Sequence, residues 1–450
     1  MRPDSGLIHQ ALLHGLPAGA ALCVAFSGGR DSTVLLYALA KLRGERRFEL
    51  RAAHVNHALQ AVAPDWERHV MEVATRLDVP CSVQRVVVRS DHSQGLEAAA
   101  REARYDALRS QLGAGAWLLT AHHADDQLET VLLHLLRGSG VSGLTGVPRD
   151  VPFGHGRLCR PLLAVPAEAV QAYATEILEP AGIGWLNDPM NADPAYDRGY
   201  IRHQVAPVLR GRFPAVARAA ARSAALAAEA VAMLEDLARA DAQLVLSADR
   251  LALAPLRALG PARQHHLVRH LVRERGWAVP PERRLREGMA QLLEAAPGRQ
   301  PVLRWGGHEI RRFRQHLYLL DTGAEWAVAD ATPHDWRNRD TLVLGGPRGE
   351  LGFSPQTGAG LAPDIVAEGL QVMFRSGGER VRADGDRHHR TLKYLFQTYG
   401  VVPWMRCHVP LVFAAGKLAA VADLWTADWA AARPSESGLA IVWRRHAPIR

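Results

Sequence analysis

The sequence predicts an α/β protein: a Rossmann-like parallel sheet with helices on both faces, followed by a mainly helical middle domain and a small α+β domain at the C-terminal end. The sheet is indicated by short apolar runs that alternate with helical patterns up to about residue 210, because such alternation is typical of parallel strands joined by crossover helices. A stretch rich in alanine and leucine over residues 215–246 predicts the long helices of the second domain. Strand-like runs beyond residue 366 predict the third domain.

Four strands and four helices are expected in the sheet domain. The strands are short β-like runs, at residues 21–26, 48–56, 81–88 and 117–121. The helices have apolar residues at helical spacing, at residues 32–42, 64–77, 96–112 and 125–136. Ligands of such sheets bind beyond the carboxyl ends of the strands, so motifs that follow the strands should converge there.

The expected domain boundaries follow from changes in these patterns. They are 1–212 for the sheet domain, 213–345 for the middle domain, 346–364 for a linker and 365–450 for the C-terminal domain. Helical patterns at 256–274 and 284–294 precede strands from 302 to about 344 in the middle domain. The linker is predicted because its stretch is rich in glycine and proline.

Charge and cysteine content limit the classes of protein that fit. The chain has 450 residues, a net charge of +8 and a pI near 9.7, and nearly all of its positive charge is arginine, which suits phosphate contacts. Its 4 cysteines are far apart and form no C-x-x-C pair, so neither a zinc knuckle nor an iron–sulfur site is predicted. Because no signal segment or long apolar run is evident, we expect a cytoplasmic protein without a membrane partner.

The turn S-G-G-R-D-S at residues 27–32 joins the first strand to the first helix. Glycine lets the backbone approach an anion, and the start of a helix attracts negative charge. The turn lacks the glycine spacing of both a Walker loop and a dinucleotide-binding loop. It either holds phosphate or is a compact turn that saves space.

Two further motifs follow strands. H-V-N-H at residues 54–57 ends the second strand, where it could meet a purine; the alternative is a pair of partly buried histidines bonded to the backbone. H-H-A-D-D-Q-L-E-T at residues 122–130 opens the fourth helix, and Asp126 and Glu129 share one face of it. With Asp125, these carboxylates could bind magnesium or a cationic amine, or they could be ordinary partners of the helix dipole.

Arginines in three segments are candidates for contacts with phosphate, although each also fits an ordinary solvated face. They are Arg101 and Arg104 on the third helix, Arg137 at the start of a glycine-rich segment, and Arg198 and Arg202 on a later helix. The segment 137–144 has the composition of a mobile loop or of a helix cap followed by a turn.

The turn at residues 27–32 resembles the S-G-G-x-D-S loop of the N-type ATP pyrophosphatases, enzymes of the PP-loop superfamily that cleave ATP between its α and β phosphates and adenylate a substrate. The resemblance implies that the loop wraps pyrophosphate and that Asp31 helps to hold Mg²⁺. The ATP-binding residues expected are Ser27, Gly28, Gly29, Arg30, Asp31, Ser32, His54 and Asn56.

Four motifs in order resemble the tRNA(Ile)-lysidine synthase family: S-G-G-R-D-S at 27, H-V-N-H at 54, E-A-x-A-R-E-x-R-Y ending at Tyr105, and H-H-x-D-D-Q-x-E-T at 122. Segments 137–144, 160–163 and 198–207 extend the match, and F-R-S-G-G-E-R at 374 with H-H-R-T-L-K at 388 resembles the last domain of that family. The sequence departs from the family pattern at Met190, where serine is usual, and at Gly199, where asparagine is usual.

This resemblance implies a two-step reaction on an isoleucine tRNA with a CAU anticodon. ATP adenylates the wobble cytidine and releases pyrophosphate, then the amine of free L-lysine attacks C2 and AMP leaves, so that the codon read changes from AUG to AUA. The catalytic residues expected are Asp31, His123, Asp126 and Glu129, with Asp126 and Glu129 gripping the lysine amine. Contacts with tRNA are expected from Arg101, Arg104, Arg137, Arg198, Arg202, Arg380, Arg390 and Lys393, with Trp404 as a stacking face.

Two alternatives stay open. One is a tRNA thiolase with the same loop, against which the lack of C-x-x-C pairs counts. The other is a nonenzymatic RNA-binding or ATP-sensing protein, against which the acidic cluster at residues 125–129 counts. The sequence leaves the oligomeric state open, with a homodimer as one option.

Overall fold

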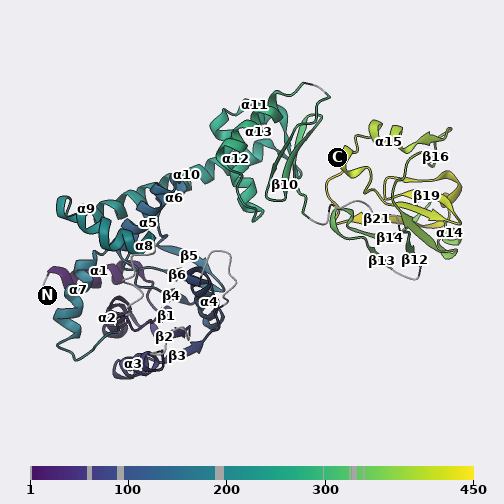
Figure 1. Cartoon of the computed structure of the whole chain (residues 1–450). Helices are drawn as coiled ribbons and strands as arrows, with labels where there is room; N and C mark the ends of the chain where they lie inside the picture. The colour runs from purple at the N-terminus through teal and green to yellow at the C-terminus, as the bar shows by residue number, and fades with distance from the viewer. Residues whose placement is uncertain are drawn as a thin grey trace. The chain divides into compact units, whose positions relative to one another are not determined.

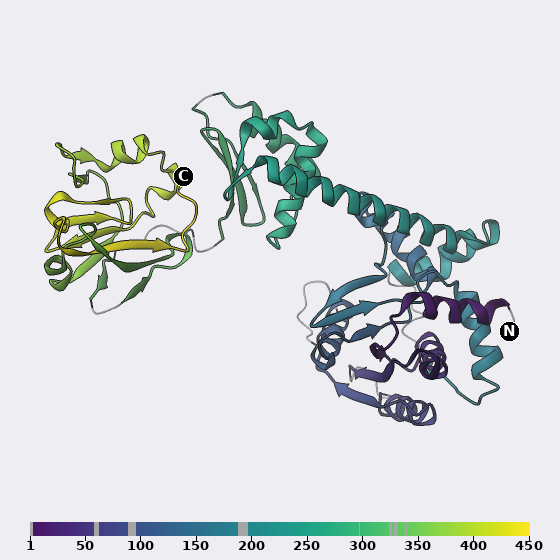
Figure 2. The same cartoon turned by 180° about the vertical axis from the view of Figure 1, so that it is seen from behind.

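A computed structural model describes residues 3–57, 63–88, 96–187, 197–296, 298–323, 326, 332–337 and 340–450. The chain forms two compact units, Met1–Met233 and Leu234–Arg450, and Figures 1 and 2 show the elements of each. In the described part of the chain, no helix combines the length and the apolar character needed to cross a bilayer.

The first unit is built on a six-stranded sheet with the order β3-β2-β1-β4-β6-β5. The strands are β1 (Ala21–Ala25), β2 (Glu49–Asn56), β3 (Cys81–Arg85), β4 (Trp117–Leu119), β5 (Asp150–Phe153) and β6 (Gly156–Cys159). All neighbours are parallel except β5 and β6, which form an antiparallel hairpin. The four predicted strands are confirmed, and the hairpin was not predicted.

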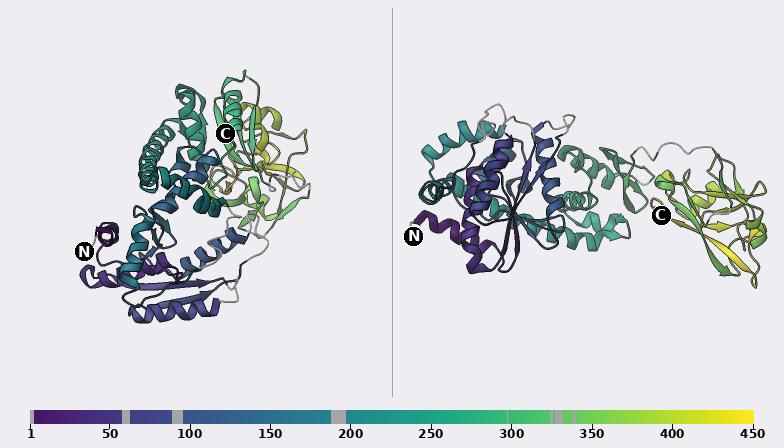
Figure 3. Two further views of the ribbon diagram at one scale, coloured as in Figure 1. Left: turned by 60° about the vertical axis from the view of Figure 1, so that its left-hand side comes forward. Right: turned by 90° about the horizontal axis from the view of Figure 1, so that it is seen from below.

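Helices cover both faces of this sheet (Figure 3). Leu22 and Val24 of β1 lie in a core shared with four α-helices, whereas Cys23 between them lies in a second core with Leu108 of α4 and with Leu112, which follows that helix. The four helices of the first core are α1 (Pro3–Gly15), α2 (Arg30–Arg46), α3 (Ala63–Arg76) and α7 (Ala167–Tyr173), and α4 spans Leu96–Gln111. Because successive strand residues face opposite sides, a strand buried on both faces needs the continuous apolar run that β1 has.

The order of the strands places the starts of two helices side by side. β1 and β4 are neighbours, and α2 follows β1 as α5 (Ala124–Leu136) follows β4. The carboxyl ends of parallel strands meet at one edge of a sheet, so the two helix starts share that edge. Among the described residues of this unit, the remaining helical elements are α6 (Val141–Leu144), the π-helical η1 (Ala174–Leu178), α8 (Asp197–Tyr200), the π-helical η3 (Ile201–Val205) and α9 (Ala206–Arg212).

Helix α10 (Val216–Val245) crosses the boundary between the two units. In the second unit, α11 (Leu253–Ala258), α12 (Pro261–Glu274) and α13 (Glu282–Glu294) share a core with an antiparallel sheet of order β7-β8-β11-β10-β9. Its strands are β7 (Leu246–Ser247), β8 (Arg250–Ala252), β9 (Val302–Trp305), β10 (His308–Phe313) and β11 (His316–Asp321). The predicted helices at 256–274 and 284–294, and the strands that follow them, are confirmed.

The C-terminal part of the second unit is mostly antiparallel sheet. One sheet contains β12 (His334–Trp336), β15 (Leu370–Met373), β18 (Leu411–Ala414), β19 (Lys417–Val421) and β20 (Trp425–Thr426). A second contains β13 (Thr341–Val343), β14 (Glu350–Thr357) and β21 (Ser437–Arg444), and β16 (Arg380–Val381) pairs with β17 (Arg390–Thr391). The helical elements in the described residues of this part are η5 (Gly346–Arg348), α14 (Pro363–Ala367), α15 (Leu392–Thr398), η6 (Pro403–Met405) and η7 (Asp428–Ala430).

The prediction of a linker at 346–364 is wrong, because this segment is part of the folded sheet. Strand β14 pairs with β21 along its whole length, from Glu350 opposite Arg444 to Thr357 opposite Ser437. Leu351 and Leu361 are fully buried. Glycines with positive φ in this segment form turns between paired segments, and the same composition in the sequence is typical of a flexible connection.

Candidate active site

Side chains from other parts of the chain pack closely against Gly28 in the glycine turn. This residue has a φ of +82°, and a Cβ atom added to it would lie 2.8 Å from Cδ1 of Leu186 and 3.0 Å from Cγ2 of Val70. The N–H of Leu186 donates to the carbonyl oxygen of Gly28 at 2.8 Å. The left-handed conformation therefore favours glycine, and a Cβ atom would also force the side chains of Leu186 and Val70 to shift.

Hydroxyl groups within the turn fix the start of α2. Oγ of Ser27 lies 3.0 Å from Oγ of Ser32, and Ser32 and Thr33 both donate to the carbonyl oxygen of Gly29 at 2.9 Å. Gly29 is the extended N-cap residue of this 17-residue helix. The loop thus presents the N-terminus of a long helix, which favours an anion such as phosphate.

Replacing Gly28 with alanine is expected to lower the free energy of unfolding by about 2–4 kcal/mol, from left-handed strain plus overpacking against Leu186. Gly19 is the matched control, since its φ is +71° but nothing lies within 4 Å of an added Cβ. Gly19→Ala should therefore cost only about 1–2 kcal/mol. Urea unfolding of both variants measures the difference, and equal losses would contradict the role of packing.

His54 and Asn56, predicted to bind ATP, both make contacts inside the protein. Nδ1 of the buried His54 lies 2.9 Å from the carbonyl oxygen of Phe26, and burial lowers the pKa of His54. Nδ2 of Asn56 donates to Oε1 of Glu67 at 2.6 Å, and Glu67 also accepts from Arg85. These contacts brace the carboxyl ends of β1 and β2 beside the loop, and a contact with the nucleotide stays a prediction. No pattern in the sequence indicated a role for Glu67 or Arg85.

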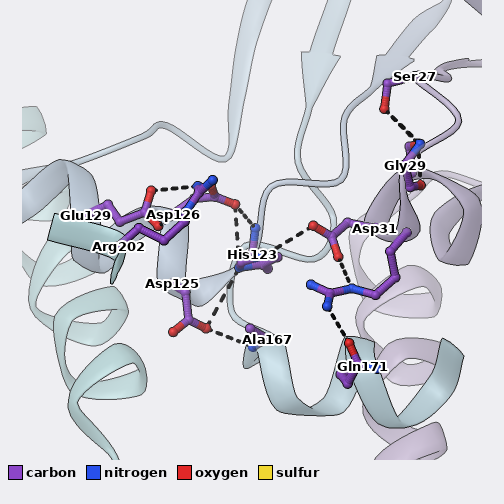
Figure 4. A network of polar contacts seen from close by, with 12 residues as sticks. Ser27, Gly29, Asp31, His123, Asp125, Asp126, Glu129, Ala167, Gln171 and Arg202 are labelled. Carbon is purple, nitrogen blue, oxygen red and sulfur yellow. Dashed lines mark hydrogen bonds and ion pairs between the residues drawn. The ribbon is translucent and has the colours of Figure 1, made fainter. Parts of the chain in front are cut away.

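His123 connects the loop to the acidic cluster (Figure 4). It is the N-cap residue of α5, and its Nε2 lies 3.5 Å from Oδ2 of Asp31. Its Nδ1 lies 3.5 Å from Oδ2 of Asp126 and 3.8 Å from Oδ2 of Asp125. The same Oδ2 of Asp126 accepts the backbone N–H of His123 at 2.9 Å. Two motifs more than 90 residues apart in the sequence therefore meet at one imidazole ring.

The charges at this junction stabilise one another. Burial would lower the pKa of His123, but the hydrogen bond to Asp31 and the charges of Asp126, Asp31 and Asp125 raise it to about 9. Burial would raise the pKa of Asp31, but His123 and Arg30 lower it to about 2. Burial also lowers the pKa of His122 to about 4. At neutral pH, His123 is therefore a cation and Asp31 an anion, while His122 is neutral.

We expect the stability contributed by His123 to depend on pH. Because its pKa rises from 6.5 to about 9 on folding, the protonated ring stabilises the fold fully below about pH 6.5, and this contribution disappears as the pH rises through 9. The gap in unfolding free energy between the wild type and His123→Gln should shrink over that interval. Urea unfolding at pH 6, 7.5 and 9 tests this on both proteins, and a gap that does not change with pH would contradict it.

Asp126 and Glu129 lie together, as predicted, and two arginines from η3 and α8 contact them. Both carboxylates are buried, with 8% and 3% of their surface exposed. Nε of Arg198 donates to Oε2 of Glu129 at 2.8 Å, and Nε of Arg202 donates to Oε1 at 2.6 Å. Each arginine also reaches Oδ1 of Asp126, at 3.2 Å and 3.5 Å. The arginines predicted to bind tRNA thus pair with the carboxylates predicted to bind lysine.

Asp125 has a structural contact that the sequence could not indicate. Its Oδ2 accepts the backbone N–H of Ala167 at 2.8 Å, and its Oδ1 accepts from Arg210. It therefore ties the start of α5 to the start of α7 and to α9.

The remaining predicted tRNA contacts are spread over both units. In the first unit, Arg101 and Arg104 lie 5.0 Å and 5.6 Å from the ring of Tyr105, and Arg137 pairs with Asp197 at 2.9 Å. In the second, Arg380 lies on β16, Arg390 donates to Asp386 at 2.8 Å and Lys393 lies on α15. Their contacts with tRNA stay predictions.

Two other expectations can be compared with the structure. The prediction of Trp404 as a stacking face is wrong, because its ring is buried against Tyr318 and Phe313 in the core of the second unit. In the glycine-rich segment, Arg137 caps α5, Gly138 has a φ of +71° and α6 follows. This is the cap-and-turn alternative. Met190 lies outside the described residues, and Gly199 lies in α8.

At the glycine loop, the carboxylate of Asp31 could bind a magnesium ion. Among the described residues, no group of three histidine, cysteine or acidic side chains is arranged to hold a metal. Mg²⁺ commonly binds one or two carboxylates together with substrate phosphates and water. Asp31, ionised and about one-third exposed, fits as the protein ligand of an ion carried by a nucleotide.

Residues 8–209 match the family model described as PP-loop domain. Together with the parallel sheet, the glycine loop and the neighbouring carboxylates, this match assigns the chain to the ATP-using enzymes of the PP-loop class. Residues 251–318 match the TilS substrate binding domain, and residues 370–443 match the TilS substrate C-terminal domain.

Curated relatives match the whole length of the chain. The tRNA(Ile)-lysidine synthase of Alkalilimnicola ehrlichii is 43% identical and covers 100% of this chain and 98% of its own. The synthases of Methylococcus capsulatus and Pseudomonas aeruginosa are each 39% identical, covering 95% and 98% of this chain and 97% of their own chains. The chain belongs to the tRNA(Ile)-lysidine synthase family, and it is an ATP-using ligase.

A solved structure also resembles part of the chain. It is the U34-tRNA thiolase NcsA from Methanococcus maripaludis with its 4Fe-4S cluster, 15% identical with a TM-score of 0.39, covering 49% of this chain and 76% of that one. The full-length match to the synthases decides against both alternatives left open by the sequence.

Proposed function

We propose that this enzyme ligates free L-lysine to C2 of the wobble cytidine in the CAU anticodon of tRNA(Ile), in the cytoplasm, converting ATP to AMP and pyrophosphate. The observation that best supports the proposal is the unbroken series of contacts from Asp31 through His123 to Asp126, and from there through Arg202 to Glu129 (Figure 4). The glycine loop, which suits phosphate, thus lies next to carboxylates that suit an ammonium group. An enzyme that joins a nucleotide-activated base to an amine needs a phosphate site and an amine site close together.

In the first step, O2 of the cytosine attacks the α-phosphorus of ATP, and the bond to the pyrophosphate oxygen breaks. Phosphoryl transfer depends on positioning and on neutralising charge more than on a protein nucleophile. The backbone of Gly28 and Gly29 and the hydroxyls of Ser27 and Ser32 would hold the phosphates at the start of α2. Mg²⁺ held by Asp31 and the phosphates would supply further neutralisation of their charge.

In the second step, the amine of lysine attacks C2, and the bond from C2 to the oxygen of the AMP group breaks. Asp126 and Glu129 would hold the ammonium group until it releases a proton to water. His123 is protonated at neutral pH because its pKa is raised to about 9, so we assign it to stabilising phosphate charge. A base would need to be unprotonated at that pH.

Lysine would reach the two carboxylates by exchange with the guanidinium groups of Arg198 and Arg202. An arginine released in this way would be able to contact RNA phosphate, the role predicted for both from the sequence. The exchange would therefore link lysine binding to tRNA binding.

The product would read AUA in place of AUG. The tRNA body would contact the basic residues of the second unit, among them Arg380 and Lys393, through its phosphates. A homodimer stays a prediction.

Radiolabelled lysine and a tRNA(Ile) transcript test the proposal directly. Incubation with ATP and Mg²⁺ should give labelled tRNA and equal amounts of AMP and pyrophosphate. A transcript with uridine at the wobble position is the matched control and should take up no label. ADP as the product, or label in the control transcript, would contradict the proposal.

A further inference from the structure

Arg30 contacts one carboxylate oxygen of Asp31, the predicted metal ligand. Its Nε donates to Oδ1 of Asp31 at 2.8 Å, and its Nη1 donates to Oε1 of Gln171 on α7. The other carboxylate oxygen of Asp31 faces His123. Both oxygens of Asp31 are thus in contact with cationic side chains (Figure 4).

Helix α7 holds Gln171 in a fixed place beside the loop. The N–H of Ala167, at the start of this helix, donates to Asp125, and Ala169 and Val170 are buried in the core. At its other end the ring of Tyr173 packs edge-on against Tyr37 of α2, with 6.3 Å between ring centroids. A rigid helix therefore presents the amide oxygen that Arg30 contacts.

A Mg²⁺ ion bound to Asp31 and the Arg30 guanidinium would be cations at the same carboxylate. Mg²⁺ binds carboxylate oxygen at about 2.0–2.1 Å, so the ion would lie close to the guanidinium. Two cations next to each other also repel. A guanidinium that leaves the carboxylate is well suited to bind phosphate through two hydrogen bonds.

We propose that Arg30, held by Gln171, is an internal cation that a nucleotide-bound Mg²⁺ displaces from Asp31, and that Arg30 then contacts the triphosphate. Gln171 is thus a positioning residue that acts through Arg30, and the two residues together set the Mg²⁺ concentration at which ATP binds. This inference rests on the proposed use of ATP with Mg²⁺ at the loop.

The test measures binding rather than turnover. The full-length protein is titrated with the nonhydrolysable analogue α,β-methylene-ATP by calorimetry at a series of Mg²⁺ concentrations. Gln171→Leu should lower the Mg²⁺ concentration for half-maximal binding about threefold, and Arg30→Met should lower it about tenfold, since the competitor is weakened or removed. Arg30→Met should also weaken binding of the analogue at saturating Mg²⁺, because a phosphate contact is lost.

Glu168→Gln is the matched control, because Glu168 lies on the same helix and contacts Arg210 at 3.6 Å. It should leave the Mg²⁺ midpoint unchanged. An unchanged or raised midpoint in both test variants, with normal binding by the wild type, would overturn the inference alone. Failure of the wild type to bind the analogue at any Mg²⁺ concentration would overturn the proposed ATP use and this inference with it.

Discussion

Asp31→Asn is expected to slow tRNA-dependent exchange of labelled pyrophosphate into ATP by roughly a hundredfold to a thousandfold, comparable to the loss of one preorganised electrostatic contact in other active sites. Asp31 is the acidic residue in the first turn of α2, and it carries a full negative charge because its pKa is about 2. Asparagine keeps the shape of the side chain and removes the charge. The variant also loses the ion pair with His123.

Asp106→Asn provides the control for this experiment. Asp106 is an exposed residue of α4 that pairs with Arg109 one turn away, and exposed pairs contribute at most about 1 kcal/mol to stability. Its exchange rate should match the wild type. A thermal melt of each variant checks that the fold is retained, and a near-normal rate for a folded Asp31→Asn protein would rule out its proposed role.

Glu129→Gln is expected to raise the KM for lysine about tenfold to a hundredfold, since a contact between charged groups contributes about 1.5–3 kcal/mol. Pyrophosphate exchange, which does not involve lysine, should stay close to the wild-type rate. Glu129 is the better site for this test than Asp126, because Asp126 also accepts the backbone N–H of His123. Lysine titrations and exchange assays on the same preparation separate the two effects.

Two further variants support the interpretation of that result. Glu129→Asp keeps the charge on a shorter side chain and should restore part of the lysine affinity. Glu168→Gln removes an exposed carboxylate from α7 and should change neither measurement. A parallel loss of exchange and lysine affinity in Glu129→Gln would reject the division of the site into a phosphate half and an amine half.

Local patterns in the sequence were sufficient to predict four of the six strands of the sheet domain. Strands β1 and β4 are continuous apolar runs because their residues are buried on both faces of the sheet, as Cys23 and its neighbours in β1 illustrate. The convergence of Asp31 and His123 follows from strand order, since β1 and β4 are neighbours. Parallel topology alone therefore predicted that these two motifs would meet.

The contacts that close the site depend on residues far away in the sequence. Arg198 and Arg202 contact Glu129 across 69 and 73 positions, and no local pattern distinguishes them from solvated charges. The linker was mispredicted for the same reason, because whether a stretch rich in glycine forms a strand depends on its partner, here β21. Trp404 was misassigned because burial of an aromatic ring depends on tertiary packing.

The pairing of β14 with β21 determines how recognition by the last domain should be tested. A chain cut after residue 363 would keep β14 and lose every backbone partner that β21 supplies. The exposed edge of this eight-residue strand would promote aggregation. Weak tRNA affinity in such a fragment would therefore indicate misfolding. Charge-reversal substitutions at Arg380 or Lys393 leave that ladder intact and would report recognition itself.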